Sequence, residues 1–221
     1  MTEATSPLTH PDPTKQALLQ AAAAEFAERG FQLGRVRSIA GRAGTNVAAV
    51  NYHFGSKEAL YFAVLHQLMS ATFERFPLVE ESSRGTRRPA ERFTHAVGKL
   101  LRRFASPDHS MQLRDLIVRE LANPTAALDR LLAEVARPQF MTMKSLVAEL
   151  LGPRASEREV AAATFSIAGQ CIFYLLARPI IARFHPDAQP RSEDEIVWLA
   201  EHIARFSLAG LQATREAIEA R

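Results

Sequence analysis

Residues 36–57 read VRSIAGRAGTNVAAVNYHFGSK, and this stretch decides the fold. Two short helical patterns, at about residues 35–43 and 47–54, meet at a tight corner formed by residues 43–46. Small residues at the corner allow two helices to cross closely, and Asn46 is a strong N-cap for the second one. The pattern predicts a helix-turn-helix.

The charge of this stretch is one-sided. No Asp or Glu occurs from Phe31 through Lys57, whereas Arg35, Arg37 and Arg42 all do. A solvated surface usually mixes both signs, so an acid-free basic stretch on two short helices favours a polyanionic partner. Because the second helix of a helix-turn-helix can lie in a major groove, we expect that partner to be duplex DNA.

The side chains that point outward here suit groove reading. Asn can pair with an adenine edge, small apolar groups can meet thymine methyls, and Tyr can reach phosphate. The expected DNA-contacting residues are Arg35, Arg37, Thr45, Asn46, Val47, Ala48, Asn51, Tyr52, His53 and Lys57. Among them, Asn51 and Thr45 are expected at bases, and Arg35, Tyr52 and Lys57 at phosphates. Two alternatives stay open: Arg35, Arg37 and Arg42 as ordinary solvated charges, and His53 packed beside Phe54.

Almost everything after Thr14 has helical periodicity, without an alternating strand pattern, so the fold class is all-α. The first helix is expected at 15–29, with Thr14 as N-cap and Gly30 at its end, and Gly34 is the expected N-cap of the second. A fourth helix should run from Lys57 to about Phe76. Further helices are expected at about 90–105, 109–122, 125–151, 156–177 and 193–219, with a kink or break at Pro138 and a proline-containing connection at 178–192.

This pattern divides the chain into three parts. Residues 1–13 are polar and proline-broken and are expected to be a disordered arm. Residues 14–62 form the helix-turn-helix head, and residues 63–221 form a helical body for ligand binding and dimerisation. The long helix that starts at Lys57 joins head to body.

The composition is that of an ordinary globular protein, with 221 residues, 47% hydrophobic residues and a net charge of +3. Cys171 is the single cysteine, so an intrachain disulfide is impossible and a cytoplasmic location is expected. Buried packing is the expected role of Cys171, with a redox sensor as the alternative. The most apolar stretch, residues 167–181, is too broken to span a bilayer, so no membrane partner is expected.

Several residues resemble the head of the TetR/AcrR family of transcriptional regulators. The matching residues are Ala22, Phe26, Ala27, Gly30, Phe31, Ile39, Ala40, Ala43, Gly44, Tyr52, His53, Phe54, Lys57 and Leu60. The chain departs from the usual pattern at Gly34, where the family has Thr, and at Thr45, Asn46 and Asn51. Because of these differences, the operator sequence does not follow from the resemblance to the family.

The body resembles the subgroup with a CecR-like C-terminal domain. The supporting residues are those of 46–54, Arg119-Glu120 and 124–128. This resemblance implies a cytoplasmic, ligand-responsive, dimeric repressor that binds a pseudo-palindromic operator and is released by an unknown small molecule.

Candidate ligand and dimer residues lie in the body. The expected ligand-binding residues are Arg119, Phe140, Met143, Phe165, Gln170 and Tyr174, because a guanidinium can recognise an anionic ligand and Met suits adaptable surfaces. The alternatives are an ion pair of Arg119 with Asp115 or Glu120, and plain core packing for the others. The expected dimer interface contains Val160, Thr164, Ile172, Ile196, Leu199, Ile203 and Phe206, with burial inside one chain as the alternative.

No phosphate loop, nucleophile elbow, paired carboxylates or metal-ligand spacing is visible, so we expect neither an enzyme nor a cofactor or metal. Two other classes of protein stay open. One is a helical small-molecule-binding protein without DNA function. The other is a helix-turn-helix regulator that is controlled through protein contacts.

Overall fold

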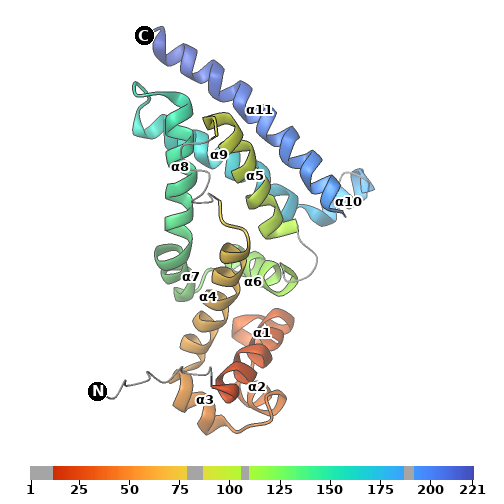
Figure 1. Cartoon of the computed structure of the whole chain (residues 1–221). Helices are drawn as coiled ribbons and strands as arrows, with labels where there is room; N and C mark the ends of the chain where they lie inside the picture. The colour runs from red at the N-terminus through yellow and green to blue at the C-terminus, as the bar shows by residue number, and fades with distance from the viewer. Residues whose placement is uncertain (1–11, 79–86, 106–109, 187–191) are drawn as a thin grey trace, which may run out of the picture.

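The computed structural model describes residues 12–78, 87–105, 110–186 and 192–221, and every regular element in those ranges is helical. This confirms the all-α prediction. Figure 1 shows a small head, with α1 to α3, at one end and a larger helical body at the other. The predicted arm lies outside the described residues, apart from Asp12 and Pro13.

Helix α1 (Pro13–Leu33) begins two residues earlier than the sequence indicates. Asp12 is its N-cap and accepts the backbone N–H groups of Thr14 and Lys15. Thr14, the cap we expected, lies inside the first turn because Pro13 fits the first helical position, where no N–H is needed. Regular helix geometry is broken at Gly30, whose φ of 73° suits glycine. The helix continues beyond the predicted end at Gly30, because residues 31–33 are again helical and Gly34 is the C-cap.

Helices α2 (Val36–Arg42) and α3 (Val47–Phe54) form the predicted corner. The N-cap of α2 is Arg35 rather than the predicted Gly34. The Arg35 side chain makes no capping hydrogen bond. The predicted N-cap of α3 is confirmed, because the Asn46 side chain accepts the Ala49 N–H at 3.0 Å.

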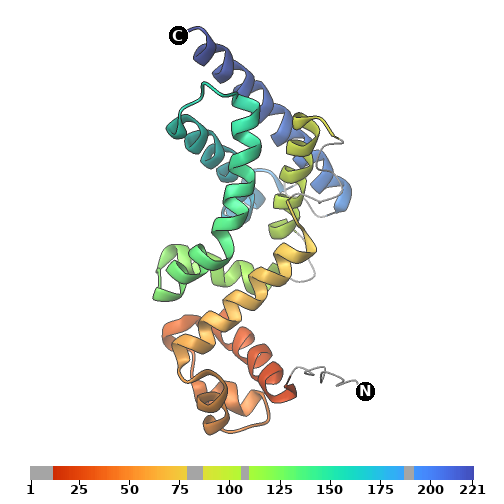
Figure 2. The same cartoon turned by 60° about the vertical axis from the view of Figure 1, so that its left-hand side comes forward.

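Helix α4 (Lys57–Arg75) matches its predicted range. Ser56 caps it by accepting the Ala59 N–H, and Phe76 ends it. Figure 2 shows α4 rising from the head into the body. It is therefore the covalent connection between the head and the body.

The body contains α5 (Pro89–Ala105), α6 (Ser110–Ala122), α7 (Ala126–Leu131), α8 (Arg137–Leu151), α9 (Glu157–Leu176), α10 (Arg178–Phe184) and α11 (Glu193–Glu219). The long helix predicted at 125–151 is interrupted by a π-helical turn, Leu132–Ala136, directly before Pro138. A wider turn accommodates the ring and the missing N–H, so the expected interruption is confirmed.

Helix α10 was not predicted, since residues 178–192 were expected to form a connection. Pro179 stands in the first turn of α10, where proline is tolerated, and Ala177 separates α10 from α9. The proline therefore starts a helix at this point instead of preventing one.

The core consists of two hydrophobic clusters. The first joins the head to α6 and α7 and includes Leu18, Phe26, Ile39, Val50, Leu60, Leu113, Leu116 and Leu131. The second fills the body and includes Phe93, Val97, Leu146, Val147, Ile167 and Ile203. Because the first cluster crosses between head and body, the two parts share one packed contact.

Within the described ranges, none of the helices combines the length and the apolar character that a bilayer span requires.

Candidate DNA interface

The corner between α2 and α3 is fixed by the backbone. The Thr45 N–H donates to the Ala40 carbonyl at 2.9 Å, and Gly44 has a φ of 66°. Because a left-handed residue is needed at the turn, glycine is the residue that fits there. The corner holds α2 and α3 at the end of the molecule opposite α11 (Figure 1).

Helix α3 buries one side and exposes the other. Val50 is 1% exposed and packs in the first cluster, with Phe54 beside it. The outward face consists of Asn46, Val47, Ala48, Asn51 and Tyr52, all exposed, while Thr45 is half-buried at its edge. Tyr52 is 85% exposed and therefore projects into solvent. Of the two side chains predicted at bases, Asn51 thus lies on an accessible helix face and Thr45 lies at its edge.

The cations predicted to contact DNA differ in how they are held. Arg35 and Arg37 are exposed, and in the described parts of the chain neither guanidinium has an ion-pair partner. Lys57 is half-buried: its Nζ donates to the Gln32 carbonyl at 3.1 Å and lies 4.8 Å from the centre of the Phe31 ring. Lys57 therefore fastens the end of α1 to the start of α4.

Arg42 and His53 are held by acidic residues of the head. Arg42 donates to both oxygens of Glu28, at 2.9 and 2.7 Å, and this contact raises the pKa of Arg42. The Nδ1 atom of His53 lies 3.6 Å from a carboxylate oxygen of Asp12, and its side chain is only 12% exposed. These contacts give both residues an intramolecular role beside any contact with DNA.

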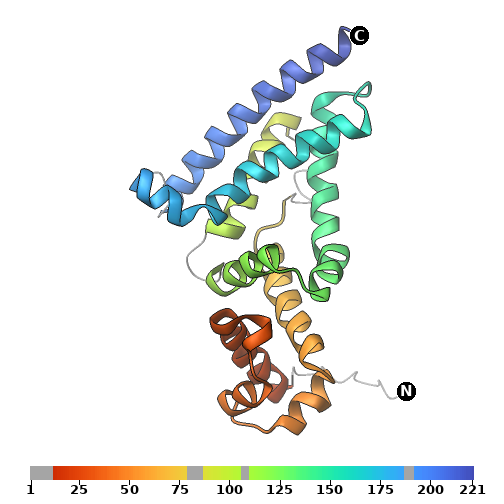
Figure 3. The same ribbon diagram turned by 180° about the vertical axis from the view of Figure 1, so that it is seen from behind.

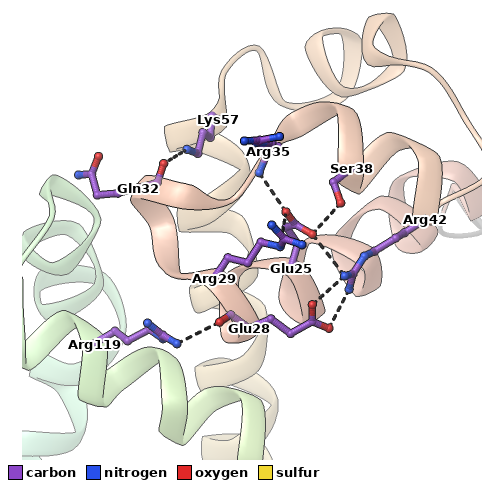
Figure 4. A network of polar contacts seen from close by, with 9 residues as sticks. All are labelled: Glu25, Glu28, Arg29, Gln32, Arg35, Ser38, Arg42, Lys57 and Arg119. Carbon is purple, nitrogen blue, oxygen red and sulfur yellow. Dashed lines mark hydrogen bonds and ion pairs between the residues drawn. The ribbon is translucent and has the colours of Figure 1, made fainter.

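A network of polar contacts joins α2 to α1 (Figure 4). The Glu25 carboxylate accepts the Arg35 backbone N–H at 3.2 Å and the Ser38 hydroxyl at 2.7 Å. The guanidinium groups of Arg29 and Arg42 each lie 3.5 Å from it. The start of α2 is therefore tied to α1 by a carboxylate that is 0% exposed.

Arg119, a predicted ligand residue, lies at the junction between head and body. Its Nη2 donates to the carbonyls of Ala27 and Glu28 at the end of α1, at 3.2 Å each (Figure 4). It also lines an open cleft of about 650 Å³ together with Arg29 and Asn123. A cation can satisfy the last carbonyls of a helix, and Arg119 lies at such carbonyls of α1, away from the interior of the body.

The neighbouring Glu120 makes a second contact at the junction. Its buried carboxylate accepts the Tyr61 hydroxyl at 2.7 Å, the Thr125 N–H at 3.0 Å and the Thr125 hydroxyl. Burial, with Glu120 beside it, raises the pKa of Tyr61, so this phenol stays protonated and donates. Helices α4, α6 and the start of α7 are joined at this point.

The other predicted ligand residues lie in the body. The rings of Phe140 and Phe165 are 5.0 Å apart between α8 and α9. Gln170 donates to the Ser207 hydroxyl at 3.2 Å and so links α9 to α11. Met143 is buried in the second cluster, and Tyr174 is half-buried beside it. The structure therefore keeps these five residues in the body and separates Arg119 from them.

Most of the predicted dimer residues are buried within the single chain. Val160, Thr164, Ile196, Leu199 and Ile203 are all at most 5% exposed, and Ile172 is half-buried. For these residues the structure shows the alternative that the sequence left open, burial inside one chain. Of the seven, Phe206 alone is exposed, at 68%.

The outward side of the same helices is also apolar. Its exposed large residues are Phe173, Leu176, Ile180, Phe184, Val197, Trp198 and Phe206, whereas the exposed Phe165 packs against Phe140 of α8. Figure 3 shows the three helices that carry them, α9, α10 and α11, next to one another. Exposed large apolar side chains on neighbouring helices are candidates for a surface of association.

Two further predictions concern reactive side chains. Cys171 is 1% exposed, and burial raises the pKa of its thiol to about 12, which agrees with packing and not with a reactive thiolate. Across the described ranges, no group of three or more His, Cys, Asp or Glu side chains is arranged to hold a metal ion.

Glu25 is not among the residues predicted from sequence. A signal for it was present, because Glu25 follows Leu18 by seven positions and Ala22 by three and therefore lies on the apolar face of the first helix. An acid on that face needs partners inside the protein. The outward aromatic face of α9 to α11 was missed because the predicted stripes were chosen by their apolar spacing, which marks the inward face.

An accessible helix-turn-helix face without acidic residues, carried on a helical body, defines the class of helix-turn-helix transcriptional regulators. Comparison with known proteins agrees. Residues 18–64 match the family described as "Bacterial regulatory proteins, tetR family". Residues 89–211 match the family described as "HTH-type transcriptional dual regulator CecR, C-terminal domain".

Individual relatives give the same result. The HTH-type transcriptional dual regulator CecR of Shigella flexneri is 30% identical over 175 residues, which are 76% of this chain and 78% of that protein. The regulator RutR of Escherichia coli K12 is 46% identical over 55 residues, 25% of this chain and 26% of RutR. The crystal structure of FadR from Bacillus subtilis in complex with stearoyl-CoA has the same fold, with a TM-score of 0.66 and 19% identity over 88% of this chain and 98% of that one.

The chain belongs to the TetR family of bacterial transcriptional regulators and carries the CecR type of C-terminal domain.

Proposed function

We propose that this protein is a cytoplasmic, ligand-responsive repressor that binds a pseudo-palindromic operator as a homodimer and is released by a small molecule. The observation that carries the DNA part is the exposed, acid-free face of α2 and α3. Residues 14–62 serve as the DNA-binding part, and residues 63–221 bind the ligand and the second copy. Two heads related by a two-fold axis would read half-sites about one helical turn apart, or a multiple of it.

The side chains of the head divide by chemistry. Arg35 and Arg37 contact phosphates, because both guanidinium groups are exposed and carry no ion-pair partner in the described part of the chain. Tyr52 reaches a phosphate or sugar from the outer end of its helix. Asn51 and Thr45 face the bases, where an amide can pair with the adenine edge.

The second copy docks on the outward apolar face of α9 to α11. Trp198 and Phe206 lie two turns apart on α11, and Phe173 lies on α9. The indole of Trp198 stacks on His202 with ring centres 5.6 Å apart, which fixes the orientation of the indole. Large aromatic groups held in this way are typical of the centre of an interface.

Sedimentation of the Phe206→Glu variant tests the dimer. A charge in an apolar interface should shift the protein toward a monomer, whereas Leu33→Glu, an equally exposed apolar position in the head, should leave the dimer intact. If both variants stay dimeric at all concentrations, the proposed face is wrong.

The effector binds in the body, where Phe140, Phe165, Gln170 and Tyr174 connect α8, α9 and α11. Helix α4 carries the effect to the head. Its upper end is held by Arg103, which donates to the Phe76 carbonyl at 2.9 Å and stacks on the Phe73 ring, and its lower end by the bond between Tyr61 and Glu120. Linkage requires that an effector that lowers DNA affinity is itself bound less tightly in the presence of DNA, by the same factor.

A mobility shift with duplexes selected from a randomised library tests this function. Binding should weaken steeply with salt, and a metabolite that raises the melting temperature of the protein should release the duplex. A protein that binds metabolites and no duplex would be a small-molecule-binding protein without DNA function. A protein that binds duplex and ignores every metabolite of a broad panel would be controlled through protein contacts.

A further inference from the structure

The head contains a buried charge that does not belong to its reading face. Glu25 lies on α1 with a side chain that is 0% exposed, whereas the residues that face DNA in the proposed function lie on α2 and α3. A carboxylate placed in the interior requires hydrogen-bond donors and cations around it. The role of Glu25 is therefore defined by the groups that it holds.

The first of these groups is the start of α2. This helix has seven residues, and its N-cap, Arg35, supplies no side-chain oxygen to the free N–H groups. Short helices are unstable alone and depend on contacts with the rest of the protein. In a capping box, a Glu three positions into the helix accepts the N–H of the N-cap residue. Here the carboxylate that accepts the Arg35 N–H comes from α1, and the residue in the third helical position, Ser38, donates its hydroxyl to the same carboxylate.

The second group is a pair of guanidinium ions. Arg29 and Arg42 lie 3.5 Å from the two carboxylate oxygens, and Arg42 is also held by Glu28 (Figure 4). Burial by itself would raise the pKa of Glu25, but the hydrogen bonds from Ser38 and Arg35 and the two guanidinium groups together lower it. Glu25 is therefore ionised at neutral pH and lies at the positive end of the α2 dipole.

The contacts of Glu25 also affect the exposed side chains at the start of α2. Arg35 is fixed at its own backbone N–H by Glu25, while its side chain leaves the protein toward solvent. Arg37 follows in the first turn of the same helix. The direction of both guanidinium groups therefore depends on where the carboxylate anchors the start of α2.

We propose that Glu25 is a positioning residue for operator binding: by anchoring the first turn of α2 to α1, it sets the place from which Arg35 reaches a DNA phosphate. This inference rests on the proposed DNA-binding function and adds to it a residue that never touches DNA. The anchor acts through backbone geometry, so it is needed for phosphate contact and not for base preference.

The test compares Glu25→Gln with Glu28→Gln on a duplex that the wild-type protein selects from a randomised library. Glu28 also binds Arg42, lies one turn away and is exposed, so it is a matched control. We expect Glu25→Gln to bind the duplex about tenfold more weakly, which corresponds to about one charge-assisted hydrogen bond. Its salt dependence should lose about one phosphate contact. Glu28→Gln should stay within about twofold.

A double-mutant cycle with Arg35→Ala separates positioning from general destabilisation. If Glu25 acts through Arg35, the double variant should bind about as weakly as Arg35→Ala alone. Additive losses of about a hundredfold, with an unchanged salt slope in Glu25→Gln, would overturn the inference. If circular dichroism shows that Glu25→Gln does not fold, the same cycle is carried out with Ser38→Ala, and additivity there overturns it equally.

The wild-type measurement distinguishes the two levels of failure. If the wild-type protein enriches no duplex from the library, the proposed function itself fails. If it does enrich one and Glu25→Gln behaves like Glu28→Gln, only the role of Glu25 is refuted.

Discussion

Replacing Tyr61 with Phe tests the contact that joins α4 to α6. Tyr61 and Glu120 are each 1% exposed, and the phenol donates to the carboxylate at 2.7 Å. The substitution keeps the aromatic ring, which packs edge-on against Phe26 with ring centres 4.9 Å apart. It removes only the hydroxyl, so it isolates a single hydrogen bond between the head and the body.

The expected loss follows from the burial of both partners. A hydrogen bond to a charged group contributes about 1.5–3 kcal/mol, and a buried carboxylate that loses a donor keeps its desolvation penalty. Glu120 retains both donors of Thr125, which limits the loss. We therefore expect the free energy of unfolding to fall by about 2 kcal/mol, equivalent to a melting temperature about 4–8 °C lower for a chain of this size.

The assay is thermal and urea denaturation followed by circular dichroism, at equal protein concentration because dimerisation contributes to stability. Tyr174→Phe is the control: its ring is half-buried, and its hydroxyl has no hydrogen-bond partner within the described ranges. That variant should stay within about 0.5 kcal/mol of the wild type. If the two variants are equally stable, the bond between Tyr61 and Glu120 does not join head and body in the way described here.

Three other predictions concern the head. Lys57→Ala removes both the tie to the Gln32 carbonyl and a positive charge that follows α3 in the chain, so it should weaken binding to all duplexes and lower the salt slope by about one, as measured by mobility shift; a change confined to one sequence would contradict it. Asn51→Ala should relax base preference by about 1–3 kcal/mol at one position of the operator, as read by competitive selection; an unchanged ranking of sequences would remove Asn51 from the bases. The folded-state pKa of Glu25 is below its ordinary value of 4.5, so its charge stabilises the fold above that pH and this contribution is lost as the pH falls through the folded-state pKa. The stability difference between wild type and Glu25→Gln should therefore narrow from pH 7 to pH 3, and a difference that widens in acid would refute the assignment.

The helices of the head could be predicted from sequence because their limits are set by local chemistry. Asn46 caps its helix as expected, and the φ of 73° that Gly30 can adopt breaks the regular geometry of α1. These signals act within one turn of chain and need no knowledge of the rest of the fold. The exposed face of α3 follows from them, since Val50 and Phe54 are the apolar residues at the spacing of the buried side.

The remaining features depend on contacts between segments far apart in sequence. Arg119 lies 92 positions from Ala27, whose carbonyl it binds, and nothing in the sequence around Arg119 distinguishes that contact from a ligand site. For a similar reason, the sequence does not distinguish the side of α11 that faces the body from a dimer surface. Both sides of that helix carry apolar residues, such as Ile203 inward and Phe206 outward, so helical spacing alone does not say which side is covered.

The hydrophobic cluster shared by α1, α4, α6 and α7 limits how the protein can be engineered. A chimera that grafts residues 14–62 onto another regulator would leave Leu18 and Phe26 without the apolar side chains of Leu113, Leu116 and Leu131. The transplanted segment would then expose an apolar surface at the junction with its new body. A transferable head therefore has to carry the matching turns of α6 and α7 with it. Otherwise the recipient protein has to offer an apolar surface of the same shape at the junction.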